Sequence, residues 1–230
     1  MLLFILCLYV ISCKSFIFFG GFLPSWFIPK CTPIPGHNFC LKDLVQLKQQ
    51  TQIDILTPNS NGYDDAKNLF GSVNEKTPDF VAVIPNVNKY ERKLAKLLEF
   101  LIDFDEKFVI KSGGHNVGGY STCDGSCFVI SLSNLTDIDI DTEKERVKID
   151  PGVRSNRLVL ALDNLGYWLP IGADDIGMGG HIHGGGWGVG IRQYGLATDG
   201  VIRAKVITYT IKPNGKAKAR VSIASKNINN

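Results

Sequence analysis

Residues 111–119 read Lys-Ser-Gly-Gly-His-Asn-Val-Gly-Gly, and residues 177–188 read Gly-Met-Gly-Gly-His-Ile-His-Gly-Gly-Gly-Trp-Gly. These two glycine segments hold four and seven, respectively, of the chain's 24 glycines, and together three of its four histidines. Glycine loses more conformational freedom on folding than any other residue, so this density is tolerated mainly where the backbone comes very close to another group. The two segments therefore predict a binding site, and a large, flat, phosphorylated ligand is the first candidate.

Upstream of the first glycine segment, the pattern predicts a strand, a helix and a second strand. The apolar runs 80–84 and 108–110 are of strand type, and Pro85 closes the first of them. The connection is long enough for these two strands to pair in parallel, and the glycine segment begins where the second strand ends. Between the strands, leucines recur at the three- and four-residue spacing of one buried helix face: Leu94, Leu97, Leu98 and Leu101.

The rest of the chain predicts a mixed α and β fold with both glycine segments on loops that leave strands. A helix is expected over 156–165, with Gly166 at its C-terminal end. Residues 16–77 are irregular in pattern, with one helix near 41–50. Further strands are expected at 127–132, 137–141, 146–150, 201–211 and 218–223, the last two joined by a turn at Asn214-Gly215.

Composition places the chain among ordinary globular proteins. Its 230 residues suffice for one sizeable domain or two small ones. The 25 basic and 22 acidic residues give a net charge of +3, and no basic run is long enough for a nucleic-acid footprint. Nucleic acid is therefore not expected as a partner.

Residues 1–15 predict a secretory signal peptide. An apolar run leads to Ser12-Cys13-Lys14-Ser15, where small residues suit a cleavage site. The alternative is an uncleaved anchor, because apolar residues resume at Phe16 and continue to Ile28 beyond the single Lys14. We therefore expect a secreted protein, with membrane attachment only if this segment stays uncleaved.

Signal removal would leave four cysteines, and an even number in a secreted chain favours disulfides. Local pairing of Cys31 with Cys40 and of Cys123 with Cys127 is the simplest connectivity, and the other two pairings stay open. A metal site at Cys123-x-x-x-Cys127 is the competing interpretation, weakened by the lack of a second such pair. Asn134-Leu135-Thr136 is a glycosylation sequon and fits a secreted surface loop.

Consecutive glycines let backbone N–H groups converge on an anion, most often a diphosphate. Neither glycine segment matches the usual nucleotide fingerprints, because a Gly-x-Gly-x-x-Gly match that starts at Gly177 fails at Ile182. A Rossmann or P-loop assignment would therefore be forced. A glycine-rich turn with only a folding role is the alternative for each segment.

The histidines allow a metal site as a further alternative, in which His181 and His183 join Asp174 or Asp175. Two histidines separated by one residue project together only on a strand, and a run of glycines makes a poor strand, which weakens this interpretation. His37 stands alone in an irregular region and is expected at the surface.

Several motifs in order resemble FAD-linked oxidases of the berberine-bridge-enzyme type, which carry the vanillyl-alcohol-oxidase or PCMH-type FAD-binding domain. This resemblance spans residues 78–218 and implies an α+β fold of two small subdomains, a βαβ unit followed by a mixed or antiparallel sheet with helices. Residues 16–77 would precede that domain, and 219–230 would form a polar tail. Besides the glycine segments, the motifs are Asn134-Leu135, Pro151-Gly152-Val153, Leu169-Pro170-Ile171-Gly172 and Tyr194-Gly195-Leu196-Ala197-Thr198-Asp199-Gly200-Val201-Ile202.

The resemblance implies FAD as the cofactor. Its diphosphate would lie on the backbone of 112–116, with 177–186 lining the other side of the cofactor. His115 corresponds to the histidine that much of the family bonds covalently to the methyl group on the flavin's benzenoid ring, and a neutral imidazole nitrogen is a competent nucleophile near neutral pH. The implied cofactor-binding residues are Lys111, Ser112, Gly113, Gly114, His115, Asn116, Gly118, Gly172, Gly177, Gly179, Gly180, His181, Gly184, Gly185, and, at the adenine end, Val201 and Ile202.

Departures from the family pattern limit what the resemblance implies. Members with two covalent bonds carry a cysteine shortly before the second segment, where this chain has Ala173-Asp174-Asp175, so a single attachment at His115 is expected. Ile176 resembles the position that controls oxygen access in some relatives and leaves oxidase versus dehydrogenase open. The family's C-terminal substrate domain, which supplies the catalytic base, is absent from this sequence, and a partner chain could supply it.

The leading hypothesis is a secreted FAD-dependent oxidoreductase, or its FAD-binding half. It would take a hydride from a small-molecule alcohol, sugar or amine onto a flavin that is bonded to His115. The first alternative is an inactive FAD-binding or interaction module. The second is a metalloenzyme that uses His181 and His183.

Overall fold

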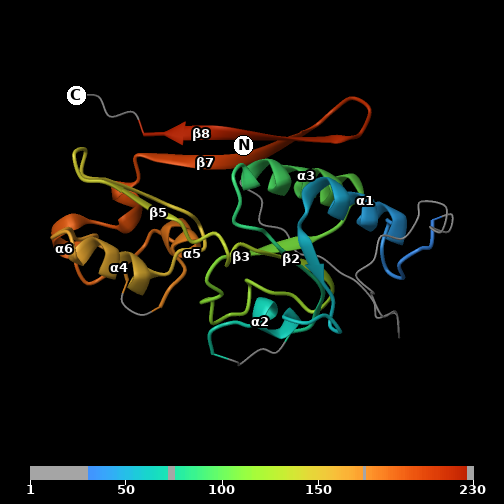
Figure 1. The fold of residues 1–230 in the computed structure, drawn as a ribbon, viewed down its shortest axis with the longest axis horizontal. Coiled ribbons are helices and arrows are strands. Elements are labelled where there is room, and N and C mark those ends of the chain that lie inside the picture. The colour runs from blue at the N-terminus through green and yellow to red at the C-terminus, as the bar shows by residue number, and fades with distance from the viewer. Residues whose placement is uncertain (1–30, 72–75, 173–174, 227–230) are drawn as a thin grey trace.

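The computed structural model describes residues 31–71, 76–172 and 175–226, which adopt an α+β fold (Figure 1). The predicted signal peptide lies outside these residues. We call residues 31–132 the first lobe and residues 135–200 the second lobe. A long hairpin runs across the top of the first lobe and reaches over the second in Figure 1.

The first lobe is built on a four-stranded sheet with the strand order β1-β2-β4-β3. β4 runs parallel to both of its neighbours, and β1 is antiparallel at the edge. The two strands expected to pair in parallel, β2 and β3, are therefore parallel but separated by β4. Residues 127–130 of β4 are fully buried, as suits a strand covered on both faces. The strands are β1 (Asp54–Leu56), β2 (Pro78–Val83), β3 (Phe108–Lys111) and β4 (Gly125–Ser131).

Helices lie on both sides of this sheet. In Figure 1, α1 (Leu41–Thr51) and α3 (Tyr90–Asp103) lie above it, and the short α2 (Tyr63–Lys67) lies below. The predicted apolar face of α3 is confirmed, because three of its leucines are buried and the fourth is partly buried against the same core. These leucines are Leu94, Leu97 and Leu101, with Leu98 partly exposed.

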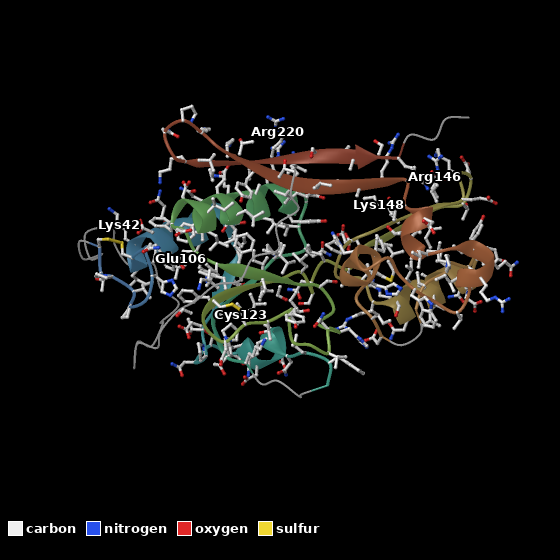
Figure 2. The ribbon with its side chains drawn as sticks, turned by 180° about the vertical axis from the view of Figure 1, so that it is seen from behind. Lys42, Glu106, Cys123, Arg146, Lys148 and Arg220 are labelled. Atoms are coloured by element: carbon white, nitrogen blue, oxygen red, sulfur yellow. A yellow bond between two sulfur atoms is a disulfide. The ribbon has the colours of Figure 1, made fainter. Side chains whose placement is uncertain are left out.

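The N-terminal part of the first lobe holds more regular structure than its pattern predicts. The expected helix is α1, but the chain also adds β1 to the sheet and forms α2 before β2. His37 is not at the surface as expected. Its side chain is fully buried, and its Nδ1 lies 2.7 Å from Oε2 of Glu106, which follows α3 (Figure 2).

Both local cysteine pairs form disulfides. Cys31 and Cys40 have a Cα–Cα distance of 5.4 Å, and Cys123 and Cys127 one of 6.0 Å. The second disulfide closes the end of the long connection between β3 and β4, at the labelled Cys123 in Figure 2. The metal interpretation of Cys123-x-x-x-Cys127 is therefore wrong, because both sulfur atoms are bonded to each other.

The second lobe begins with the expected antiparallel pair, β5 (Ile138–Asp141) and β6 (Arg146–Ile149). The predicted helix is α4 (Ser155–Asp163), and Gly166 takes a left-handed conformation (φ +76°) just beyond it, as a helix end requires. A small separate core fills the space between these elements. It consists of Val153, Leu158, Leu162, Ile171 and Met178.

The second glycine segment is not a loop that leaves a strand, in contrast to the expectation. Residues Met178–His183 form the short helix α5, and the chain then passes through α6 (Ile191–Tyr194) and the 3₁₀ turn η2 (Ala197–Gly200). Two glycines give this helix a low propensity, which is overridden because hydrogen bonds to the surrounding backbone fix the segment at both ends.

The expected hairpin consists of β7 (Arg203–Ile211) and β8 (Ala217–Ser225); β7 begins two residues later than predicted, whereas β8 is longer than predicted and includes most of the expected polar tail. Its β8 edge lies along α3, whose carboxylates accept hydrogen bonds from the strand's backbone. Asp103 accepts from the N–H of Ala217 (2.6 Å) and Glu99 from that of Ala219 (2.8 Å). These hydrogen bonds satisfy backbone N–H groups on the edge of β8 that would otherwise stay exposed.

Candidate cofactor site

The two glycine segments meet backbone to backbone. A Cβ atom on Gly113 would lie 2.4 Å from the Cα of Gly177, and a Cβ on Gly177 would lie 2.3 Å from the Cα of Gly113. Only glycine permits this approach, since real Cβ atoms essentially never come within 3.0 Å of other heavy atoms. The fold thus joins the end of β3 in the first lobe to the start of α5 in the second.

The chain after β6 holds both segments in place. The carbonyl of Pro151 accepts the hydroxyl of Ser112 (2.5 Å) and the N–H of Gly179 (3.1 Å), one from each segment. The carbonyl of Val153 accepts the N–H of Met178 (2.8 Å). Residues 151–153 are the Pro-Gly-Val motif, and the structure gives this motif a positioning role between the two glycine segments.

The first glycine segment carries unused backbone donors. Within the described part of the chain, the N–H groups of Gly113, Gly114 and Asn116 donate to no acceptor. Gly114 has a left-handed conformation (φ +68°), and a left-handed residue next to a right-handed one is the backbone pattern that turns successive N–H groups toward one point. Such a concavity binds anions.

Two cations lie beside this concavity. The guanidinium Nη1 of Arg154 would be 3.3 Å from a Cβ on Gly113, and it donates to the carbonyl of Asp175 (2.8 Å). Lys111 is buried, with 4% of its surface exposed, and its Nζ donates to the carbonyl of Ala66 (2.9 Å). Burial, together with the nearby Arg154 charge, lowers the pKa of Lys111 to about 8. Positive charge beside unpaired N–H groups favours an anionic ligand.

His115 follows these donors directly and stacks on Phe70. The two ring centroids are 4.0 Å apart and the planes differ by 13°. Phe70 is half exposed and belongs to the connection after α2. No pattern in the sequence points to this residue, because it falls in the region of irregular pattern.

The other histidines have different partners. His181 accepts the N–H of Gly172 at Nε2 (3.0 Å), and burial lowers the pKa of its imidazole, which fits a neutral acceptor. His183 is paired through Nδ1 with the carbonyl of Gly179 (2.6 Å). Among the residues that the structure describes, the one metal-type group of side chains includes neither histidine, and Asp174 lies outside those residues. The described geometry gives no support to the metal alternative.

Residues 88–211 match the family model described as an FAD binding domain. The chain belongs to this family. It is 30% identical over 160 residues to (R)-6-hydroxynicotine oxidase of Paenarthrobacter nicotinovorans, which covers 69% of this chain and 34% of that protein. It is 39% identical over 106 residues to reticuline oxidase of Eschscholzia californica, covering 43% of this chain and 19% of that protein.

A solved structure supports the same assignment. The 6-hydroxy-D-nicotine oxidase of Arthrobacter nicotinovorans superposes with a TM-score of 0.61 at 27% identity, covering 74% of this chain and 36% of that chain. The chain spans about a third or less of the length of these relatives. The expected PCMH-type fold and the expected cofactor, FAD, are thereby confirmed.

The first segment of this FAD binding domain fits the diphosphate of the cofactor. Three unpaired N–H groups and two neighbouring cations are the kind of donors that phosphate oxygens require. The hydroxyl of Ser112 does not contribute to this set of donors, because it donates to the carbonyl of Pro151 and stabilises the fold.

Most glycines of the second segment serve contacts within the FAD binding domain itself. A Cβ would lie 2.6 Å from the carbonyl oxygen of Pro151 at Gly179, and 2.4 Å from the Cβ of Ala197 at Gly186. Gly180 differs, because a Cβ there would meet nothing within 4 Å, and at Gly184 it would make only ordinary contacts. Among the described residues, no contact requires glycine at these two positions, so they are candidates for the close approach of a ligand.

The remaining predicted residues lie around this centre. Gly172 joins His181, and Gly185 accepts the N–H of Thr198 through its carbonyl, which ties α5 to η2. Val201 and Ile202 lie between η2 and β7, and Gly118 packs beside the ring of Tyr120.

In the described part of the chain, no helix has the length and apolar character that crossing a bilayer requires.

Proposed function

We propose that this protein is a secreted FAD-dependent oxidoreductase, or its FAD-binding half, that carries its flavin on His115 and accepts a hydride from a small-molecule alcohol, sugar or amine. The observation that carries the proposal is that anion-binding N–H groups and a candidate nucleophile lie on consecutive residues. The unpaired N–H groups of Gly113, Gly114 and Asn116 flank an imidazole nucleophile at His115.

The chain's own residues divide the work of binding. The first segment would hold the diphosphate, with Arg154 and Lys111 supplying positive charge. The open positions at Gly180 and Gly184 would admit the close approach of the cofactor. Val201 and Ile202 would contact the adenine end. When bound, the flavin supplies the redox chemistry, and the protein orients it and excludes water.

Covalent attachment balances as a two-electron process. His115 would supply the imidazole nitrogen that bonds to the methyl carbon of the flavin ring, with one proton leaving the imidazole and one leaving that carbon. The electron pair released would pass to the flavin, and an electron acceptor such as dioxygen would remove it by taking up two electrons and two protons.

A single attachment is proposed, because the described residues offer no cysteine thiol as a second nucleophile. The four cysteines within the described residues form the disulfides Cys31–Cys40 and Cys123–Cys127. A disulfide sulfur is not a thiolate and forms no bond to the flavin ring. Residues 173–175, before the second segment, are Ala-Asp-Asp.

The test is acid precipitation of the purified protein, followed by the absorbance of the washed pellet. We expect a yellow pellet from the natural sequence, a colourless one from His115→Ala and a yellow one from the matched control His183→Ala, whose histidine lies on the other segment. A yellow pellet from His115→Ala would refute attachment at His115. A colourless natural protein with stoichiometric zinc or iron would replace the flavin proposal by the metalloenzyme alternative.

Turnover of alcohols, sugars and amines by the yellow protein separates an enzyme from an inactive FAD-binding module. Activity that appears only with a second chain would assign the substrate domain to a partner. The FAD-binding module is the second candidate, because the matched residues 88–211 belong to the FAD binding domain.

Secretion is the proposed localisation. Two disulfides form readily only in an oxidising compartment, and the sequon residue Asn134 is exposed. The protein expressed in secreting eukaryotic cells should appear in the medium and migrate faster after treatment with an N-glycosidase. Asn134→Gln should abolish that change in migration. Retention of the protein in the reducing cytosol would contradict the proposal.

A further inference from the structure

The contact between Phe70 and His115 has features that core packing does not explain. The rings are nearly parallel at a centroid distance of 4.0 Å, yet 51% of the Phe70 surface is exposed. Phe70 is not a member of either hydrophobic core. Its ring therefore stacks on the imidazole without belonging to a hydrophobic core.

The backbone that carries Phe70 is fixed to the first glycine segment. The N–H of Phe70 donates to the carbonyl of Gly114 (3.0 Å), the residue that directly precedes His115. Gly114 has a left-handed conformation (φ +68°), which favours glycine, and a Cβ there would lie 3.2 Å from Cδ2 of Leu69.

The buried Lys111 provides a second connection, three residues further back. Its Nζ donates to the carbonyl of Ala66 at the end of α2, and its Cε would lie 2.9 Å from a Cβ on Gly114. Residues 66–70 are thus held at both ends by the segment that contains His115. This arrangement restrains the Phe70 ring relative to the imidazole instead of leaving it on a free loop.

We propose that Phe70 is a positioning residue for His115: its ring holds the imidazole plane in the orientation from which a ring nitrogen forms the bond to the flavin. This rests on the covalent attachment proposed above and concerns the same balanced reaction. Phe70 itself touches no reacting atom of the chain. An aromatic face restricts rotation of a stacked ring, and reactions of positioned groups depend steeply on such geometry.

The experiment uses the protein expressed in a riboflavin-auxotrophic host, so that FAD can be added afterwards. Three variants are compared with the natural sequence: Phe70→Leu, which keeps an apolar side chain without a ring; Phe70→Tyr, which keeps the ring; and Tyr209→Leu, which removes an exposed ring from the hairpin. Acid-stable flavin is followed over time, and FAD affinity is measured separately from the quenching of flavin fluorescence at early times.

We expect Phe70→Leu to slow covalent attachment by about tenfold or more while FAD affinity changes little, because misplacement of a reacting group costs rate and not binding. Phe70→Tyr and Tyr209→Leu should attach FAD at the natural rate. In the flavin-free protein, the carbon-bound imidazole protons of His115 should resonate upfield from the ring current of Phe70, and Phe70→Leu should remove that shift.

Three results would overturn the proposal. One is an unchanged attachment rate in Phe70→Leu, and another is a loss of FAD affinity as large as the loss of rate, which would indicate a merely structural role. The third is an imidazole spectrum that does not respond to Phe70→Leu. A colourless acid pellet from the natural protein would instead overturn the covalent attachment on which this inference rests, so the two failures are distinguishable.

Discussion

Gly113 and Gly177 touch through their backbones, with a Cβ on either residue falling within 2.4 Å of the other's Cα. The contact lies where the first and second lobes meet, and both segments are further tied to Pro151. Glycine at these two positions is therefore required by the protein's own packing, before any ligand is considered.

Gly177→Ala should destabilise the protein. The added methyl group would overlap the N and Cα of Gly113, and neither is the end of a flexible side chain that could move aside. Overpacking of this kind costs about 1–3 kcal/mol of unfolding free energy, which a urea titration would measure. Gly200→Ala is the control, because a methyl group there meets nothing within 4 Å. Equal stability of the two variants would contradict the contact.

Gly180→Ala should have opposite effects on folding and on cofactor binding. Position 180 lies within α5, and alanine stabilises a helix by about 0.5–1 kcal/mol relative to glycine where there is room for the methyl group. The flavin-free variant should therefore resist urea better than the natural protein. Its affinity for FAD should fall, because the methyl group would occupy the space that the ligand approaches. Unchanged FAD affinity would remove Gly180 from the site.

Lys111 should make stability depend on alkaline pH. Its folded-state pKa of about 8 is below the usual 10.5, so burial disfavours the charged form. Between these values the unfolded chain binds more protons, and the destabilisation present below pH 8 is relieved as pH rises toward 10.5. The stability of the natural protein relative to Lys111→Met should therefore rise by roughly 1–3 kcal/mol between pH 7 and 10.

Urea titrations at several pH values would measure this difference. Lys42→Met is the matched control, because Lys42 is exposed on α1 and labelled at the surface in Figure 2. Its stability relative to the natural protein should not change over the same pH range. If the stability difference between the natural protein and Lys111→Met did not change with pH, Lys111 would not be desolvated.

Tyr90→Phe should weaken the link between the lobes. The hydroxyl of Tyr90 on α3 donates to Oδ1 of Asp150 (3.0 Å), next to the Pro151 that holds both glycine segments. Burial raises the pKa of the Asp150 carboxyl above its usual value, so loss of this donor leaves a carboxylate in poorly solvated surroundings. We expect a loss of about 1–2 kcal/mol. Tyr209→Phe should be neutral, and a similar loss in both variants would argue against a specific role of the hydrogen bond.

Local patterns in the sequence predicted most elements of the fold and failed where pairing is non-local. The leucine spacing of α3 and the apolar runs of β2 and β3 gave these elements within a few residues. Nothing local to β4 specifies that it inserts between them. That choice depends on which strand can be covered on both faces, a property of the whole sheet.

In the candidate site too, local patterns predict some features, whereas others depend on residues far apart in the sequence. Both glycine segments were identified from composition, and their motifs indicated the family. The pairing of Gly113 with Gly177, the bridging role of Pro151 and the stacking of Phe70 on His115 each join residues far apart in sequence. His37 was misjudged for the same reason, because its partner Glu106 is 69 residues away.

The Gly113–Gly177 contact also has a consequence for the order of folding. It closes a loop of 64 residues (177 − 113), and loop-closure entropy delays contacts of this span relative to those within helices and hairpins. The two halves of the site should therefore come together late, after the four-stranded sheet and the β5–β6 pair have formed. A chain that misfolds late would then keep most of its secondary structure and lose its cofactor, a distinction visible by comparing circular dichroism with flavin content.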